Sequence, residues 1–369
     1  MIQIFLSNYY LNHINSQGST FFTDENVWRW MLGVELVPAI LYFFFMFLVP
    51  RSPRWLYTKG KVEEAKEVLN TIHGTEIAEL EIESIEKNIT EGKQKEKISI
   101  LELLKPSLRF IMIVGLVVGV LQQITGINAV YFYATSIFKQ TGIGSDAAFS
   151  SGVLLSFTSV LFTIVSMVLI DRMGRRPLLL IGMAGIAISL LLCAYGFNQA
   201  TYKLTSQEIS KFENFDSTNL LEFEDKVYSS DVAFKNDMKS ALGNQVYAKN
   251  EGAILESATD INAALVLIGI LGFIACFAFS LGPVMWVLLS EMYPNRYRGL
   301  AIGVIGFVNS FVSWLIQQIF PWELSNLGNA LSFFIFGGIA LFGFFILLKI
   351  LPETKGKSLE QIESELVKN

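Results

Sequence analysis

The sequence predicts an all-α membrane protein, and three observations support this fold class. Hydrophobic residues make up 52% of the 369-residue chain and charged residues only 17%, whereas a soluble globular domain carries about 25% charged residues. The chain contains seven apolar stretches long enough to cross a bilayer as helices. The links between these stretches are alternately rich and poor in Lys and Arg, as in multi-pass membrane proteins.

Each predicted span holds about 20 predominantly apolar residues, the length at which a helix crosses the hydrocarbon core. A helix satisfies its own backbone hydrogen bonds, which is essential where no water is available. The predicted spans are residues 29–49, 108–133, 149–170, 177–197, 262–290, 299–320 and 328–350.

The positions of Lys and Arg predict the orientation of the chain. The segment 51–107 and the short link 171–176 are rich in these residues, whereas the link 321–327 has none. Because positively charged links stay in the cytoplasm, we expect the N-terminus outside and the C-terminus in the cytoplasm. The predicted location is the cell (inner or plasma) membrane.

The polar segments divide the chain further. We expect an outer segment at 1–28, a cytoplasmic linker at 50–107, an outer insert at 198–261 within the six spans of 108–350, and a cytoplasmic tail at 351–369. Helical spacing of apolar residues predicts short amphipathic helices at 62–72 and 76–90, with a solvated connector as the open alternative. The insert is too aromatic for a disordered linker, which favours a small, mostly helical cap.

The sequence gives no indication of catalysis or of a cofactor. It contains no H-E-x-x-H metal motif and no Gly-rich phosphate loop with its Lys, so neither an enzyme nor ATP-driven transport is expected. Cys193 and Cys276 lie in apolar runs and are expected to be small core residues. His13 and His73 do not form a metal cluster, and the net charge of −5 gives no reason to expect a nucleic-acid partner.

Polar side chains inside spans are costly and therefore informative. The second span contains Gln122, Gln123 and Asn128 around Gly126. A neutral amide both donates and accepts hydrogen bonds, which suits a ligand made of hydroxyl groups. Gly126 permits a broken helix that would direct these amides at one cavity. On spacing alone, hydrogen bonding between helices remains an equally good interpretation.

The fifth and sixth spans add further candidates. Gly282 and Pro283 are expected to break or kink the fifth span, and Trp286 follows one turn later, large enough to stack on a sugar ring. A packing role for this indole is the alternative. Asn309 stands alone in the sixth span as another buried amide.

Charged residues at the cytoplasmic ends of the spans form a separate group. Glu291 and Arg298 are placed to pair with Arg172, Arg175 or Arg176 and with other acids at the rim, and such pairs are expected to latch an inner gate. The alternative is that these side chains extend from helix ends to the interface and act as topology signals.

Five sequence strings, in order, resemble the sugar porter family of the major facilitator superfamily. They are PRSPRWL (50–56), QQITGINAVYFYATSIF (122–138), DRMGRRP (171–177), GPVMWVLLSEMYPNRYRG (282–299) and LPETKGKSLEQIE (351–363). The family has twelve spans in two six-helix halves. The resemblance therefore implies a major facilitator fold with one complete six-helix C-terminal bundle, one preceding span, and an N-terminal half that is largely missing.

The resemblance also implies roles for individual residues. The residues implied to bind substrate are Gln122, Gln123, Asn128, Phe277, Gly282, Trp286 and Asn309, and those implied in gating are Phe132, Tyr133 and Pro283. Ser159 stands where the family has an Asn contact. The implied cytoplasmic charge network is Asp171, Arg175, Arg176, Glu291, Arg298 and Glu353, while Arg51 replaces a Glu of the usual family string.

The implied function is secondary transport of a monosaccharide, hexose or pentose, by alternating access. Co-transport of protons stays open, as does a separately encoded N-terminal half as partner alongside the sugar and the lipid bilayer. Two alternatives are a non-transporting membrane sugar sensor and an inactive truncated carrier.

Overall fold

The computed structural model describes residues 10–11, 14, 21, 23, 26–74, 78, 82, 85, 99–139, 141, 145–212, 215–294 and 296–356. These residues belong to two compact units, one formed by Tyr10–Glu102 and one that contains Leu103–Asn369. The described parts of both units are mainly helical.

In the described part of the smaller unit lie the helices α2 (Val27–Gly33), α3 (Leu36–Phe45), α4 (Pro53–Thr58) and α5 (Val62–His73). Together α2 and α3 make a membrane-length segment in which hardly any residue is buried. A helix that is apolar all round requires lipid or another protein surface around it. The Arg51 guanidinium lies 5.5 Å from the centre of the Trp55 ring. Most of the helix expected at 76–90 lies outside the described residues.

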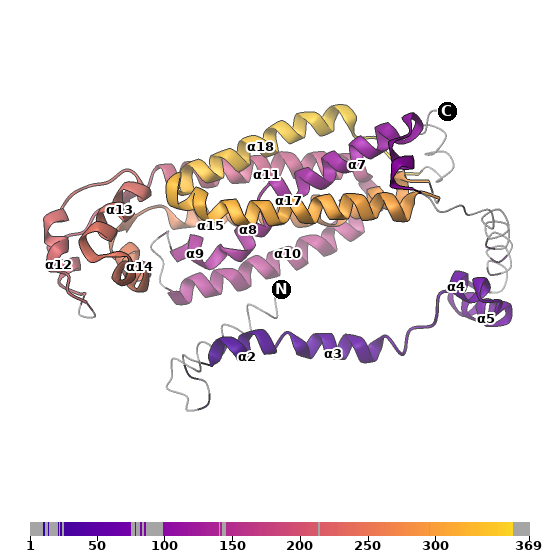
Figure 1. The fold of residues 1–369 in the computed structure, drawn as a ribbon, viewed down its shortest axis with the longest axis horizontal. Coiled ribbons are helices and arrows are strands. Elements are labelled where there is room, and N and C mark those ends of the chain that lie inside the picture. Colours follow the sequence, from indigo (N-terminus) through magenta and orange to yellow (C-terminus); the bar gives the residue numbers. More distant parts are fainter. Residues whose placement is uncertain are drawn as a thin grey trace. The chain divides into compact units, whose positions relative to one another are not determined.

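The larger unit contains the other membrane-length helices (Figure 1). After the 3-10 helix η1 (Ile100–Leu104) come α7 (Pro106–Ile124), α8 (Ile127–Phe132), α9 (Ala134–Lys139), α10 (Ser145–Met173), α11 (Arg175–Asn198), α15 (Ala263–Phe279), α16 (Leu281–Met292), α17 (Arg298–Asn326) and α18 (Gly328–Ile350). Seven segments of the described chain are long and apolar enough to cross a membrane, and they overlap the seven predicted spans. The prediction of seven spans is confirmed.

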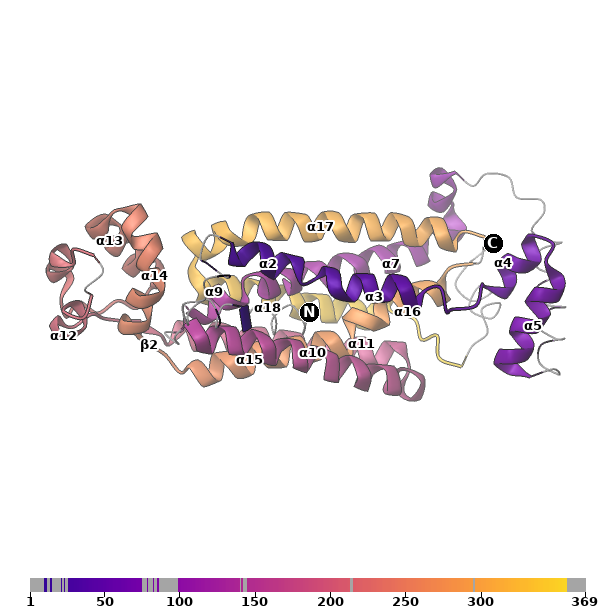
Figure 2. The same ribbon diagram turned by 90° about the horizontal axis from the view of Figure 1, so that it is seen from below.

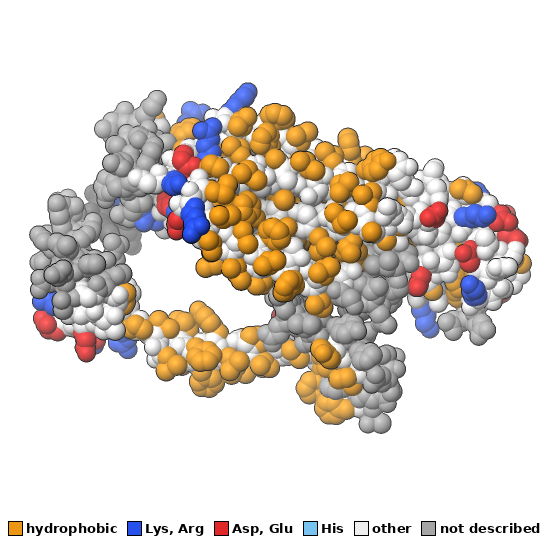
Figure 3. Space-filling view, turned by 180° about the vertical axis from the view of Figure 1, so that it is seen from behind, with side chains coloured by type: hydrophobic (Ala, Val, Ile, Leu, Met, Phe, Trp, Pro, Cys, Tyr) orange, Lys and Arg blue, Asp and Glu red, His pale blue; other side chains and the backbone are white. Residues whose placement is uncertain are grey.

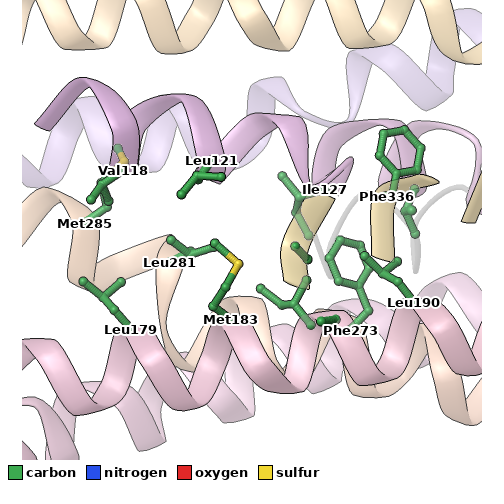
Figure 4. Packing of buried hydrophobic residues seen from close by; sticks show 14 of the residues in the cluster. Val118, Leu121, Ile127, Leu179, Met183, Leu190, Phe273, Leu281, Met285 and Phe336 are labelled. Carbon is green, nitrogen blue, oxygen red and sulfur yellow. The ribbon is translucent and has the colours of Figure 1, made fainter. Parts of the chain in front are cut away.

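Helix α11 packs along both α15 and α18, and α7 packs along α17 (Figures 1 and 2). The core between them consists mainly of aliphatic and aromatic side chains, with several methionines. Figure 4 shows Leu121 of α7, Met183 of α11 and Phe273 of α15 among the buried residues that interlock there.

Small residues allow α11 and α15 to approach closely. A Cβ added at Gly185 would lie 2.4 Å from the Cys276 sulfur, and one added at Gly269 would lie 2.5 Å from the Cys193 sulfur. Both cysteines are free thiols within this contact. Close backbone approach through small residues is a usual way for membrane helices to associate.

The outer surface of the bundle is hydrophobic. Figure 3 shows apolar side chains covering the membrane-length helices, with charged side chains gathered toward the ends of the bundle. Exposed apolar area on this scale is rare on soluble monomers and fits a multi-pass membrane protein.

An insert between α11 and α15 folds around a core of its own. It contains β1 (Thr201–Tyr202), α12 (Ser206–Ile209), the 3-10 helix η2 (Thr218–Phe223), α13 (Asp231–Leu242), α14 (Asn244–Ala258) and β2 (Thr259–Asp260), with β1 and β2 antiparallel. Tyr202, Phe234 and Tyr247 are buried in its core. Hydrogen bonds from Lys226 and Tyr228 lower the pKa of the Asp237 carboxyl.

Asp231, the first residue of α13, joins the insert to the bundle. Its carboxylate accepts hydrogen bonds from the backbone N–H and the side-chain amide of Asn329, at 3.3 and 3.0 Å, and pairs with Lys235 at 3.3 Å. Asn329 is the second residue of α18, and a carboxylate at a helix N-terminus is favourable. This contact fixes the insert to one end of the bundle.

We predict that Asp231→Ala loosens the insert, because the change leaves the buried Lys235 ammonium and the α18 N-terminus without this carboxylate. A loss of about 1–3 kcal/mol would raise proteolytic cleavage of the insert by roughly fivefold to a hundredfold, since cleavage follows the population of the open form. Limited proteolysis of the purified protein in detergent measures this. Asp216→Ala, at an exposed carboxylate in the same insert, is the control. Equal cleavage of the two variants would contradict the prediction.

Candidate binding site

The first structural element of the site is a break in the second membrane segment. Helix α7 ends at Ile124 and α8 begins at Ile127, with Gly126 between them at φ +85°. This left-handed conformation costs other L-residues about 1–2 kcal/mol, and a Cβ here would also lie 3.2 Å from the Phe336 ring. The break directs Gln122 and Gln123, which precede it, and Asn128, which follows it, toward one side of α7 and α8.

A second break lies between α15 and α16 at Ser280, whose φ and ψ are −128° and −94°. The sequence placed this break at Gly282 and Pro283, which is wrong by two to three residues. Pro283 is the third residue of α16, and the first turn of a helix tolerates proline because its N–H groups have no intrahelical partner. The Gln122 side chain donates a hydrogen bond to the Leu281 carbonyl at 3.0 Å, which ties the two breaks together.

Amide side chains from α7, α8 and α17 form one hydrogen-bond network. The Asn309 amide donates to the Gly119 carbonyl at 2.8 Å and to Gln122 Oε1 at 2.7 Å. Gln123 Nε2 donates to Asn309 Oδ1 and to Gln122 Oε1, both at 3.2 Å. Asn128 Nδ2 donates to Gln123 Oε1 at 2.9 Å. Gln122, Gln123 and Asn309 are buried, so the network satisfies amides that lipid could not.

Helix α17 contributes a polar stripe rather than a single amide. Asn128 Nδ2 also donates to Ser313 Oγ at 2.7 Å, and Gln317 Nε2 donates to the same hydroxyl at 3.0 Å. The prediction that Asn309 stands alone in its span is wrong. Asn309, Ser313 and Gln317 follow each other at intervals of four residues, a spacing that places them on one helix face and that is visible in the sequence.

These elements surround a cavity of about 440 Å³, within the range of about 300–1,000 Å³ typical of ligand pockets. The residues that line it are Gln122, Gln123, Ile127, Asn128, Tyr131, Ser159, Thr163, Phe277, Ala278, Gly282, Pro283, Trp286 and Asn309. The set includes all seven residues proposed to bind substrate, together with Pro283 and Ser159. Sequence reasoning missed Tyr131, Thr163, Ile127 and Ala278.

Phe132 and Tyr133, the other proposed gate residues, are not among the lining residues. The Phe132 side chain is 68% exposed. The Tyr133 ring meets Phe320 of α17 edge-on, with ring centroids 5.5 Å apart.

The lining suits a neutral, hydroxyl-rich ligand. Its polar groups are amides and hydroxyls, which can donate and accept hydrogen bonds, and none of the lining residues is charged. Trp286 is 42% exposed and offers an open indole against which a ring can stack. No group of three or more His, Cys, Asp or Glu within the described part of the chain is arranged to hold a metal ion.

A charge cluster lies at the end of the bundle where α11 begins. Glu353 accepts hydrogen bonds from the backbone N–H groups of Arg175 and Arg176, at 3.1 and 3.2 Å. These are the first residues of α11, so the carboxylate stabilises that helix N-terminus. Gly174, at φ +95°, leaves room for it, because a Cβ there would lie 2.8 Å from the Glu353 carboxylate.

Arg175 connects this cap to two further helices. Its guanidinium contacts Glu291 at 2.6 Å and Asp171 at 3.3 Å, and Glu291 also accepts a hydrogen bond from Thr354 at 2.7 Å. The expected rim pair of Glu291 is therefore present.

The other two arginines of the expected network bind backbone carbonyls. Arg176 Nη2 donates to the Leu348 carbonyl at 2.9 Å, and Arg298 Nε donates to the Tyr293 carbonyl at 3.2 Å.

A six-span helical bundle with two broken helices, an amide-lined cavity and a charge cluster at one end has the architecture of a major facilitator transporter. The sequence model described as "Sugar (and other) transporter" matches residues 4–212 and 241–366. The chain belongs to this family, whose members are transporters and not enzymes.

Among characterised relatives, the chain is 30% identical to the arabinose-proton symporter of Bacillus subtilis over 98% of its own length and 65% of the relative. It is 28% identical to the D-xylose-proton symporter of Escherichia coli, over 98% and 61%. It is 31% identical to the major myo-inositol transporter IolT of Bacillus subtilis, over 94% and 61%. The chain thus spans less than two thirds of the length of these relatives.

Solved structures give the same picture of the fold. The structure of the proton:xylose symporter XylE bound to 6-bromo-6-deoxy-D-glucose matches with a TM-score of 0.68 and 26% identity, over 98% of this chain and 63% of XylE. An inward open conformation of XylE from E. coli matches with a TM-score of 0.62 and 23% identity, over 99% and 62%.

The comparisons do not bear out two expectations. A largely missing N-terminal half is not shown: the alignments cover 98% of this chain, 65% of the arabinose-proton symporter and 63% of XylE. They also do not support a separately encoded N-terminal half as partner.

We predict that Gly126→Ala lowers the thermal unfolding midpoint of the purified protein, because alanine is strained at this φ and meets Phe336. The expected loss is about 1–2 kcal/mol. Gly338→Ala is the control, since a Cβ at Gly338 inside α18 meets nothing within 4 Å and alanine favours helix. A midpoint that falls equally in both variants, or in neither, would show that the break does not require glycine.

We predict that Asn309→Ala also destabilises the bundle, because it removes the donor that joins α17 to α7. Interhelical hydrogen bonds in membranes contribute about 0.6–2 kcal/mol. Asn326→Ala is the matched control, because Asn326 is exposed on the same helix and donates to the Trp322 carbonyl of its own turn. Thermal unfolding in detergent compares the two, and an unchanged midpoint for Asn309→Ala would argue against a structural network.

Proposed function

We propose that the chain acts in secondary transport of a monosaccharide, a hexose or a pentose, by alternating access. The observation that carries the proposal is that the seven uncharged polar, aromatic and glycine residues singled out from the sequence line a single cavity. The names of the relatives, which include arabinose and xylose symporters, support the same substrate class.

The amide network is suited to exchange partners with a sugar. Asn128 is only partly buried and donates to Gln123 and Ser313, so ligand hydroxyls can replace these bonds with bonds of similar strength. A cavity built to hydrogen-bond hydroxyl groups rejects analogues that lack them, because its amides would then stay unpaired. Trp286 and Phe277 supply apolar faces for the C–H side of the ring.

We further propose that the two helix breaks are points of movement. Phe132 and Tyr133 lie at the end of the short helix α8 that follows the break at Gly126, and Pro283 follows the break at Ser280. In this proposal the aromatic pair closes the outer mouth of the cavity when the sugar is bound, as lids in other proteins sequester ligands.

The charge cluster is proposed to hold the cytoplasmic ends of the spans together in the outward-facing state. The contacts of Arg175 with Glu291 and of Glu353 with the α11 N-terminus link α10, α11, α16 and the segment after α18. Opening the cavity to the cytoplasm would require some of these contacts to break. The C-terminus is cytoplasmic in this proposal.

Proton coupling is part of the proposal because relatives are named proton symporters. None of the lining residues is a carboxylate, so we place the coupling proton outside the sugar cavity.

The proposal predicts that Asn128→Ala and Trp286→Ala each weaken sugar binding about tenfold, equivalent to 1.4 kcal/mol, while membrane insertion is retained. Binding of radiolabelled D-xylose, L-arabinose and D-glucose to the purified chain measures this. Asn326→Ala, on the exposed side of α17, should bind as the unchanged chain does. Variants that bind sugar normally would show that the cavity is not the site.

Counterflow in proteoliposomes separates a carrier from a sugar sensor. Uptake of labelled sugar into vesicles preloaded with unlabelled sugar is the result expected for a carrier. Binding without counterflow would favour the non-transporting sensor, and absence of both would favour an inactive carrier.

A further inference from the structure

A second cavity lies where the insert meets the bundle. It encloses about 660 Å³ and is lined from α11, from the start of α13 with the two residues before it, and from the start of α18 with the residue before it. It shares no lining residue with the amide-lined cavity described above, which is the proposed sugar site. Nothing in the transport proposal uses it.

The cavity changes from polar to apolar along the helix axes. Its polar end is formed by Asn198, the last residue of α11, and by Ser229, Ser230 and Asp231 of the insert. Seven residues back along α11 is Leu191, and a similar distance into α18 is Phe334, both apolar. Seven residues of helix correspond to roughly 10 Å, so the site suits an amphipathic ligand.

The apolar end opens onto a continuous apolar surface, which we call the outer stripe. It consists of Leu331, Phe334, Leu341, Phe345 and Leu348 of α18, all of them exposed. Intervals of three, four and seven residues place these side chains on one face of the helix. The stripe runs nearly the whole length of α18, and its start is part of the cavity wall.

The insert covers the polar end of the cavity and is held there by side-chain contacts. The Asp231 carboxylate bonds to Asn329 at the start of α18 and pairs with Lys235; Lys235 is buried and Asp231 is partly buried. Because Lys235 pairs with the Asp231 carboxylate, the remaining polar groups at this end are uncharged. They are the Asn198 amide and the hydroxyls of Ser229 and Ser230, which donate hydrogen bonds. Donors of this kind match the ester and phosphate oxygens of a lipid, which accept hydrogen bonds.

We propose that this cavity holds one glycerophospholipid of the surrounding bilayer. The acyl chain lies on the outer stripe of α18, and the glycerol and phosphate region reaches Asn198, Ser229 and Ser230. The stripe belongs to a membrane-length helix, so lipid is the amphipathic molecule that its surroundings supply. The insert thereby converts an ordinary lipid-facing surface into a pocket for a single lipid.

The test uses the full chain in phospholipid vesicles that contain a phosphatidylcholine with a photoactivatable diazirine near the ester end of one acyl chain, the part of the chain that the proposal places inside the cavity. After illumination, labelled peptides are identified by mass spectrometry. The proposal expects the label to concentrate in residues 191–198 and 327–334 and to exceed the label in residues 341–348 of the same stripe. Uniform labelling along the stripe would show annular lipid only and would overturn the proposal.

Two matched variants make the test specific. Leu331→Trp fills the cavity, whereas Leu341→Trp makes the same change on the same stripe outside it, and the two leucines are 44% and 43% exposed. Label on residues 191–198, which neither substitution alters, should fall about tenfold, or 1.4 kcal/mol, in Leu331→Trp and stay unchanged in Leu341→Trp. Equal labelling of the two variants would overturn the proposal.

A further variant tests the polar end and guards against misfolding. Ser229→Ala removes one hydroxyl at an exposed position and should leave the thermal unfolding midpoint unchanged while lowering the number of phospholipids retained through detergent purification. Native mass spectrometry counts the retained lipid. Retention equal to that of the unchanged chain would argue against recognition of the lipid's polar region.

Discussion

Hydrocarbon offers no hydrogen-bond partners, so every polar group of a span must be satisfied within the protein. This constraint determines how the bundle is built. Two spans in the described part of the bundle, α7–α8 and α15–α16, are broken, and a broken helix exposes backbone groups that lipid cannot satisfy. The Gln122 side chain binds the Leu281 carbonyl beside one break, and Asn309 binds the Gly119 carbonyl of the other broken span. The same side chains line the cavity, so hydrogen bonding between helices and ligand binding are not exclusive roles for these amides.

Both ends of the bundle use a carboxylate from a distant segment to stabilise a helix N-terminus. Glu353 binds the first N–H groups of α11, and Asp231 binds the start of α18. The surroundings of the two contacts differ. Asp231 is partly buried and pairs with the buried Lys235 within the folded insert, which favours a permanent contact. Glu353 belongs to a cluster with the more accessible Asp171, where exposed pairs contribute little stability and rearrange more easily.

Much of the fold could be predicted because long apolar runs and their charged links report directly on the bilayer. The break at Gly126 was also predictable, since glycine in a polar stretch of a span permits a left-handed residue. The position of the second break was not. Pro283 suggested it, but proline fits the first turn of α16, and the irregular residue is Ser280. The core of the insert could not be predicted either, because Tyr202, Phe234 and Tyr247 meet only after the segment folds.

A structure of the chain determined with a bound monosaccharide tests the central claim most directly. The account predicts sugar density in the cavity, with hydroxyl groups within hydrogen-bond distance of Gln123, Asn128 and Asn309 and the ring against Trp286. Sugar density elsewhere in the chain, or an empty cavity at a saturating sugar concentration, would contradict it.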